Sequence, residues 1–198
     1  MWRVGYLLAQ QGWLLRSGGA PGADTAFDKG AIAAGGAREI YLPWPSFCRD
    51  LREHGPDTDP AYIVPDLAYH RELIDRALYI ASQYHPAWAG LEESHRKLMM
   101  RNGFQILGPD LQSPVQMVVC YAKGSVIDAR DRVVDVRGGT GQAVRVASEQ
   151  PVITYNLALP DHLAAIQAFI DRSPPTPPPP AFPKPVPKSR KRAPRLAA

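Results

Sequence analysis

The sequence is poor in cysteine and contains no long apolar run. Its 198 residues include two cysteines, Cys48 and Cys120, which lie far apart and lack the spacing of metal ligands. We interpret them as buried free thiols of a protein from a reducing compartment. No apolar run approaches the ~18–20 residues that span a bilayer, so we expect no membrane partner. The apolar start of the chain is interrupted by Gln10, Gln11 and Gly12 and has no small-residue cleavage site, which argues against a signal peptide and for a cytoplasmic protein.

Acidic residues are absent from residues 173–198, and this absence explains the formal charge of +4. That segment holds ten of the 21 prolines and six basic residues: Lys184, Lys188, Arg190, Lys191, Arg192 and Arg195. The other 17 basic residues face 19 acidic ones, which leaves residues 1–172 at −2. The composition predicts a globular domain over 1–172 and a Pro-rich, basic, disordered tail over 173–198. The tail is either simply solvated, or a basic arm that contacts nucleic acid independently of its sequence, or a nuclear-import-like cluster at KSRKR (188–192).

Most sequence signatures of catalysis and of metal binding are also missing. No Gly-rich segment is followed by the Lys-Ser/Thr of a Walker loop, and none has the G-x-G-x-x-G spacing of a dinucleotide fingerprint. There is no nucleophile elbow and no Ser-His-Asp order. His70 and His95 lie in helical periods without a second ligand at i+4, so we expect no metal site. We therefore assign no catalytic residue, and the cofactor remains unknown.

Short apolar runs alternate with helical periods along residues 1–172. Helices are predicted over 3–11, 24–34, 65–82, 91–101, 138–148 and 160–172, and strands over 13–17, 39–42, 115–121 and 151–156. We expect residues 46–63 to be irregular and residues 123–136 to form a hairpin or a loop. The run 115–121 is almost continuously apolar, which is typical of a central strand buried on both faces. The alternation predicts an α/β fold with an open, mostly parallel sheet.

Two Gly-rich segments each follow a predicted strand and precede a predicted helix. They read SGGAPGAD at 17–24 and RGGTGQ at 137–142. Glycine lets a phosphate approach the main chain, and a helix N-terminus supplies free N–H groups and the positive end of its dipole. In open α/β sheets, ligands bind beyond the carboxyl ends of the strands. Either loop alone is a weak signal, but together they predict one site for a nucleotide-like small molecule.

The predicted ligand-binding residues all belong to one of these two loops. They are Ser17, Gly18, Gly19, Gly22, Ala23, Asp24, Thr25, Gly138, Gly139, Thr140, Gly141 and Gln142. Asp24 is open to two interpretations. It either contacts a ribose hydroxyl or acts as a base, or it is simply the N-cap of the following helix.

Several longer motifs resemble those of a known superfamily. They are SGGAPGADTAF, EIYLPW, HPAW at 85–88, RNGFQILGPDLQSP at 101–114 and GGTGQAVRVA at 138–147. Together they resemble the SLOG superfamily, which includes DNA-processing protein A and the lonely-guy nucleotide hydrolases. The chain is most similar to short, phage-type DNA-processing-protein-A-like proteins over roughly residues 3–160. The resemblance implies a bacterial or phage-encoded protein with a Rossmann-like, three-layer sheet that binds nucleotides, nucleotide derivatives or nucleic acid.

The chain departs from the superfamily pattern in two places. Relatives usually begin with a further, central strand, whereas this chain starts inside the helix that would follow it. The strand at 13–17 should then either pair directly with the strand at 115–121 or leave an open edge that invites a homo-oligomer. The lonely-guy hydrolases also carry a Glu where alignment on Gly138–Gly141 puts Arg145. Arginine cannot act as an acid–base group at neutral pH, which argues against a hydrolase.

Three functions remain open from the sequence. The first is binding of a nucleotide or a nucleotide-derived ligand through the two loops. The second is a DNA-binding or recombination-mediating role that resembles DNA-processing protein A and uses the basic tail. The third is hydrolysis of an N-glycosidic bond in a nucleotide.

Overall fold

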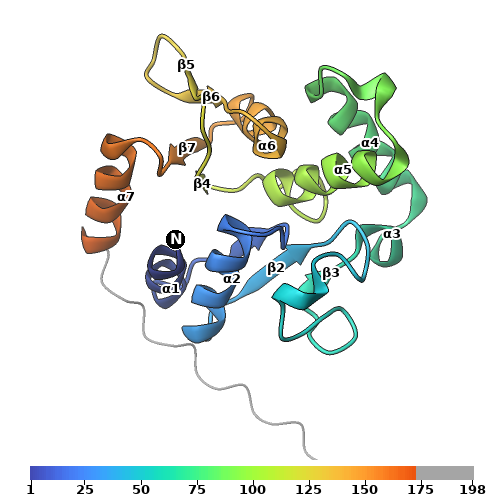
Figure 1. Cartoon of the computed structure of the whole chain (residues 1–198), viewed down its shortest axis with the longest axis horizontal. Helices are drawn as coiled ribbons and strands as arrows, with labels where there is room; N and C mark the ends of the chain where they lie inside the picture. The colour runs from blue at the N-terminus through green and yellow to red at the C-terminus, as the bar shows by residue number, and fades with distance from the viewer. Residues whose placement is uncertain (173–198) are drawn as a thin grey trace, which may run out of the picture.

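The structure is a computed structural model, and it describes residues 1–172 (Figure 1). The segment 173–198, with the expected tail and its six basic residues, lies outside the described residues. Within residues 1–172 the helices are α1 (Trp2–Gln10), α2 (Ala23–Ala33), α3 (Pro65–Ala68), α4 (Arg71–Tyr84), α5 (Glu93–Leu107), α6 (Gly139–Ser148) and α7 (Pro160–Arg172). The strands are β1 (Leu15–Ser17), β2 (Arg38–Tyr41), β3 (Tyr62–Ile63), β4 (Met117–Cys120), β5 (Val126–Ile127), β6 (Val133–Asp135) and β7 (Ile153–Asn156).

The strands of the described chain form three separate sheets. β1, β2 and β3 make a parallel sheet in that order, and β4 and β7 make a second parallel pair. β5 and β6 form an antiparallel hairpin, which was one of the two structures expected for that stretch. The protein is therefore a mixed α/β fold with parallel strand pairing, as predicted, and it is compatible with a Rossmann-like arrangement. The strands do not form the single open sheet that was expected, because β1, β2 and β3 belong to one parallel sheet and β4 and β7 to another.

The strands β1 and β4 do not pair with each other. Among the described residues β1 bonds to β2 and β4 bonds to β7, so direct pairing of the two was the wrong alternative. Each strand keeps an open edge on the side away from its partner. Met117, Val118 and Val119 are only half buried, so β4 is an edge strand and not the expected fully buried central strand.

Helices cover both faces of the strands and create two main apolar clusters. One cluster joins α1, α2 and α7 and includes Phe27, and the other joins α4, α5 and α6 and includes Phe104. Side chains alternate along a strand, so Met117 and Val119 pack on the first cluster and Val118 packs on the second. Figure 1 shows α7 beside β7 and α1 beside α2, both away from α4 and α5.

The single helix expected over 65–82 is two helices, α3 and α4. Tyr69 and His70 between them adopt extended backbone angles, with φ −121°, ψ 153° and φ −72°, ψ 159°. The Tyr69 ring stacks on Phe104, with ring centroids 5.1 Å apart. Burying this aromatic pair stabilises a break that apolar periodicity does not reveal.

The helix expected to stop near residue 101 continues to Leu107. Gly108 ends it with a positive φ of 79°, a conformation that favours glycine. The continuation adds Asn102 and Gln105 to α5, although Asn and Gly at 102–103 are poor helix formers.

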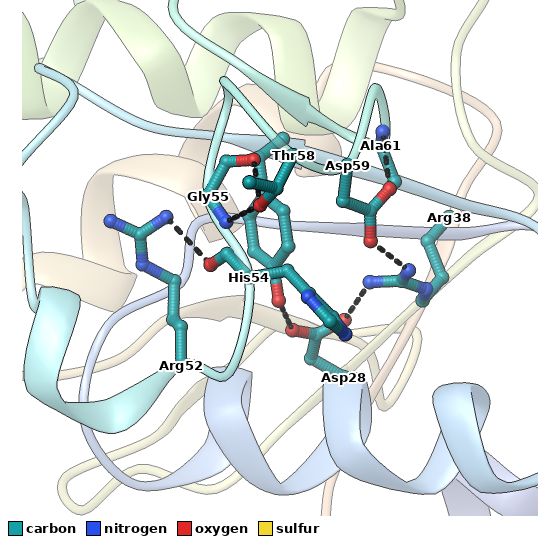
Figure 2. A network of polar contacts seen from close by, with 9 residues as sticks. Asp28, Arg38, Arg52, His54, Gly55, Thr58, Asp59 and Ala61 are labelled. Atoms are coloured by element: carbon teal, nitrogen blue, oxygen red, sulfur yellow. Dashed lines mark hydrogen bonds and ion pairs between the residues drawn. The ribbon is translucent and has the colours of Figure 1, made fainter.

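The segment 46–63, expected to be irregular, ends in strand β3 and is held by a polar network (Figure 2). Arg38 of β2 donates to Asp28 Oδ1 at 2.9 Å and to Asp59 Oδ2 at 2.6 Å. The Tyr62 hydroxyl donates to Asp28 Oδ2 at 2.6 Å. Both carboxylates are therefore paired, and the network fixes the segment against α2 and β2.

Candidate functional site

A cavity of about 700 Å³ lies between the two parallel sheets. We call it the inter-sheet cavity. Its two sides are formed by residues 14–17, which include β1, and by residues 116–121, which include β4. Residues of α1 and α2 line it from one layer, and residues of α5 and α6 line it from the other. Both Gly-rich loops contribute lining residues beyond the carboxyl end of β1, and we call this end of the cavity its mouth.

The first Gly-rich loop wraps around the carboxyl end of β1. Gly19 and Gly22 have positive φ values of 65° and 94°, which turn the chain sharply before α2. The N-cap of α2 is Gly22, so the expectation that Asp24 is the N-cap is wrong. Asp24 lies in the first turn instead, and its Oδ2 accepts the N–H of Ala20 at 3.1 Å. This bond holds the loop closed, while the side chain still lines the cavity.

The second Gly-rich loop leads from β6 into α6. Gly138 turns the chain with φ 86°, and α6 starts at Gly139. A Cβ at Gly139 would meet no atom within 4 Å, whereas a Cβ at Gly141 would collide with Val136 O. Gly139 and Thr140 line the cavity. The start of α6 is therefore exposed and unobstructed at Gly139, which leaves room for an anion at this helix N-terminus.

Arg101 is a charged side chain beside the first Gly-rich loop, and its guanidinium also lies over the Phe47 ring, 5.8 Å from the ring centroid. It projects from α5, is only 7% exposed, and packs against Gly18, where a Cβ would collide with the guanidinium. Its Nη1 donates to Gln105 Oε1 at 2.8 Å and lies 4.0 Å from Asp24 Oδ2. Its Nε has no hydrogen-bond partner within residues 1–172. Burial lowers the pKa of the guanidinium, and the Asp24 carboxylate opposes that shift.

The pairing of Arg101 is incomplete for a buried charge. A buried cation is costly unless it is paired and hydrogen-bonded, and the nearest carboxylate lies at the limit of an ion pair. A guanidinium offers five N–H donors in a planar fork that matches carboxylate or phosphate oxygens. The mouth of the cavity is therefore a place where an anion would be stabilised.

A buried polar pair joins α5 to α6 within one layer of the cavity wall. Asn102 of α5 donates from Nδ2 to Gln142 Oε1 of α6 at 2.8 Å. Both side chains are buried, at 5% and 1% exposure, and Gln142 Nε2 has no partner within residues 1–172. Asn102 lines the cavity beside Arg101, whereas Gln142 lies behind it. This pair fixes the start of α6 relative to α5.

The structure brings part of the predicted set to the cavity wall. The predicted residues that line it are Ser17, Ala23, Asp24, Gly139 and Thr140. The predicted residues outside the lining are Gly18, Gly19, Gly22, Thr25, Gly138, Gly141 and Gln142. Most of these shape the loops, and Thr25 donates from its hydroxyl to Gly22 O at 3.2 Å.

Sequence reasoning missed the contribution of α5. Arg101, Asn102 and Gln105 all line the cavity, and none of them belongs to a Gly-rich loop. The available signal was the placement of Arg101 and Asn102 directly after Met100 and before Phe104, on an otherwise buried stretch of helix. Charged and amide side chains at core positions are unusual unless they serve a site.

Arg145 lies away from the cavity. Its Nη1 pairs with Asp135 Oδ1 at 2.6 Å, and its Nε donates to Tyr84 O at 2.9 Å. It does not belong to the lining residues, and Asp24 is the one carboxylate among them. Residues 1–172 contain no group of three or more His, Cys, Asp or Glu side chains suited to a metal ion.

Comparisons with known proteins identify no relative of this chain. No protein-family model matches the chain, and the curated proteins and the solved structures also give no match. The resemblance to the SLOG superfamily therefore rests on the motifs quoted above. None of the helices formed by residues 1–172 has the length and apolar character needed to cross a membrane.

Proposed function

We propose that the protein binds a phosphate-bearing, nucleotide-like ligand at the mouth of the inter-sheet cavity. The observation that supports this most is Arg101, a buried guanidinium that packs against the first Gly-rich loop and whose Nε has no partner within residues 1–172. A bound phosphate would accept from Arg101 and from the first N–H groups of α6. The Rossmann-like, three-layer arrangement that the sequence resemblance implies would bind ligands at the same end of the strands.

The nucleoside part of the ligand is supported by different residues. Asp24 is the only carboxylate on the described cavity wall, and carboxylates accept ribose hydroxyls in many nucleotide sites. Thr140 adds a hydroxyl on the opposite side of the mouth. The nucleotide character of the ligand rests on these two groups together with the motif resemblance, whereas its negative charge rests on Arg101.

A calorimetric titration tests this function. The full chain would be titrated with inorganic phosphate, with adenosine and with adenosine monophosphate, of which only the last carries both parts of the proposed ligand. We expect the monophosphate to bind most tightly, phosphate to compete with it, and adenosine to bind weakly. Equal affinity for adenosine and its monophosphate would contradict a site built around phosphate.

Gly139→Val is the sharpest variant for this titration. The space around a Cβ at Gly139 is open and its φ is unexceptional, so the fold should survive while the side chain occupies the phosphate position. Gly90→Val is a matched control, because a Cβ at Gly90 also meets no atom within 4 Å and Gly90 lies outside the cavity. Binding should be lost in the first variant and retained in the second. Retained binding in a folded Gly139→Val protein would overturn the proposed placement.

DNA binding is the second candidate, and the charge of residues 173–198 favours it. Residues 173–198 carry six basic residues and no acidic residue, which suits sequence-independent phosphate contacts. Residues 1–172 carry a net charge of −2, which is unfavourable for a duplex-binding face. Mass spectrometry of small molecules released from the denatured protein separates the candidates, because a recovered nucleotide supports the first.

Hydrolysis of an N-glycosidic bond is not part of the proposal. Glycosidic cleavage commonly needs a positioned acid–base carboxylate, and often a second carboxylate as well. Arg145 is paired with Asp135 outside the cavity, and Asp24 already accepts an N–H from its own loop. These contacts support a binding role.

A further inference from the structure

The segment that follows β2 places an aromatic ring against Arg101. Because β1 and β2 are parallel, the chain leaves both strands at the same edge of the sheet, beside the first Gly-rich loop. Phe47 belongs to the segment after β2, and the Arg101 Cζ atom lies 5.8 Å from the centroid of its ring. This distance is within the roughly 6 Å over which the face of an aromatic ring attracts a guanidinium.

Contacts from several directions hold the Phe47 ring in place. Its N–H donates to Trp44 O at 3.1 Å, and the two rings meet edge to face with centroids 5.3 Å apart. Arg52 donates from Nη2 to Phe47 O at 3.0 Å and to Pro45 O at 2.9 Å. The half-buried side chain also packs against the apolar cluster that includes Ile40. The ring is therefore a rigid surface for the guanidinium.

The polar contacts of Arg101 do not by themselves fix the plane of its guanidinium. Nη1 makes one hydrogen bond, to Gln105, and lies 4.0 Å from the Asp24 carboxylate, while Nε has no partner within residues 1–172. A single hydrogen bond leaves the end of a long side chain free to turn about it. Contact with a flat ring face restricts that turning, because a planar guanidinium stacks on the ring.

We propose that Phe47 is a positioning residue that holds the Arg101 guanidinium in the orientation that binds phosphate. The inference rests on the proposed function and names a residue that sets the affinity of the same site. A guanidinium recognises phosphate through a planar fork of N–H groups, so the orientation of that plane decides the contact. Ordering a side chain during binding lowers affinity, and a side chain that is ordered in advance avoids this cost. Phe47 does not line the described cavity wall, so it acts through Arg101.

Side-chain NMR relaxation of the Arg101 Nε–H group tests the positioning in the full chain without any ligand. We expect an ordered Nε–H group in the wild-type chain and in Phe47→Tyr, which keeps the aromatic face. In Phe47→Leu the group should become mobile on the ps–ns timescale, because leucine fills much of the space but has no ring face. Its proton resonance should also move, since the ring no longer shields it.

Titration of the same proteins with inorganic phosphate measures the effect on affinity. Phe47→Leu should bind phosphate about three- to tenfold more weakly, the cost of ordering one long side chain, and Phe47→Tyr should restore the wild-type affinity. Phe169→Leu is the matched control, because Phe169 is also half buried but packs on Trp13, with ring centroids 5.6 Å apart. Arg52→Met is a second variant that keeps the Phe47 ring and releases its main chain, and it should weaken binding in the same direction.

The two measurements separate this inference from the proposed function. An Arg101 Nε–H group that stays ordered in folded Phe47→Leu overturns the positioning role, whether or not the chain binds phosphate. A mobile group with unchanged phosphate affinity overturns the effect on binding, as does an equal loss of affinity in Phe169→Leu. A wild-type chain that binds no phosphate overturns the proposed function, and the relaxation data then still decide whether Phe47 orders Arg101.

Discussion

Replacing Arg101 with methionine should separate a binding role from a structural one. Methionine preserves the aliphatic volume on α5 and removes the charge. The substitution removes one hydrogen bond to Gln105 and a 4.0 Å contact with Asp24. It also removes the buried Nε donor, which has no partner in the described chain. Replacing a buried, incompletely paired charge by a packed apolar side chain is often neutral or stabilising by about 1–4 kcal/mol. We expect the free energy of unfolding to be unchanged or raised by about 1–2 kcal/mol in phosphate-free buffer.

Urea denaturation with and without phosphate measures this prediction. A gain of 1–2 kcal/mol corresponds to a melting temperature higher by about 2–8 °C for a domain of this size. The wild-type chain should gain about 2.7 kcal/mol when phosphate reaches 100 times its dissociation constant, and Arg101→Met should gain none. Arg96→Met is the matched control, because Arg96 lies on the same helix, donates to Ala89 O at 3.2 Å and does not line the cavity. A loss of about 3–5 kcal/mol in phosphate-free Arg101→Met would refute the reasoning and make Arg101 a structural ion-pair residue.

Three further predictions follow from other parts of the chain. Burial raises the pKa of the Cys120 thiol to about 11, so alkylation near pH 8 should modify Cys48 much faster than Cys120. Peptide mapping measures the two rates, and equal rates would contradict the buried position of Cys120. Burial acts to raise the pKa of Asp59, but the N–H of Ala61 and the Arg38 guanidinium outweigh it and hold the pKa below its usual value. The stability from Asp59 should thus be present above about pH 4 and be lost as the pH falls through its folded pKa, a dependence that Asp59→Asn should weaken in acid denaturation curves. Deleting residues 173–198 should leave the melting temperature nearly unchanged, because the segment is Pro-rich with few apolar residues. The deletion should also weaken any DNA binding and make its affinity less dependent on salt. DNA affinity that the deletion does not change would place the DNA-binding site within residues 1–172.

The sequence was informative where local chemistry decides the structure. Gly22 and Gly138 mark the turns into α2 and α6 because both need a positive φ, and the strands and helices around them were predicted nearly in place. The limits of β1 and β4 were off by two residues at most. Apolar alternation and glycine positions are local signals, and they carry most of the α/β character of the fold.

The sequence was uninformative where distant packing decides the structure. Arg101 reaches the first loop only because α5 extends past residue 101 and packs across the end of β1, and no local pattern contains that contact. The break between α3 and α4 depends on the stacking of Tyr69 on Phe104, a partner far along the chain. The open edges of β1 and β4 depend on how the two sheets are placed, which a list of strands does not specify.

Anion binding between the two Gly-rich loops is tested most directly by titrating the isotopically labelled full chain with inorganic phosphate. The amide chemical shifts are measured at each step of the titration. The site predicts saturable shifts of Gly18, Ala20, Gly139 and Thr140 in the wild-type chain, and their absence in the folded Arg101→Met variant. Shifts at these amides that persist in the Arg101→Met variant would contradict the proposed site. A folded wild-type chain whose two loops show no shift would also contradict it.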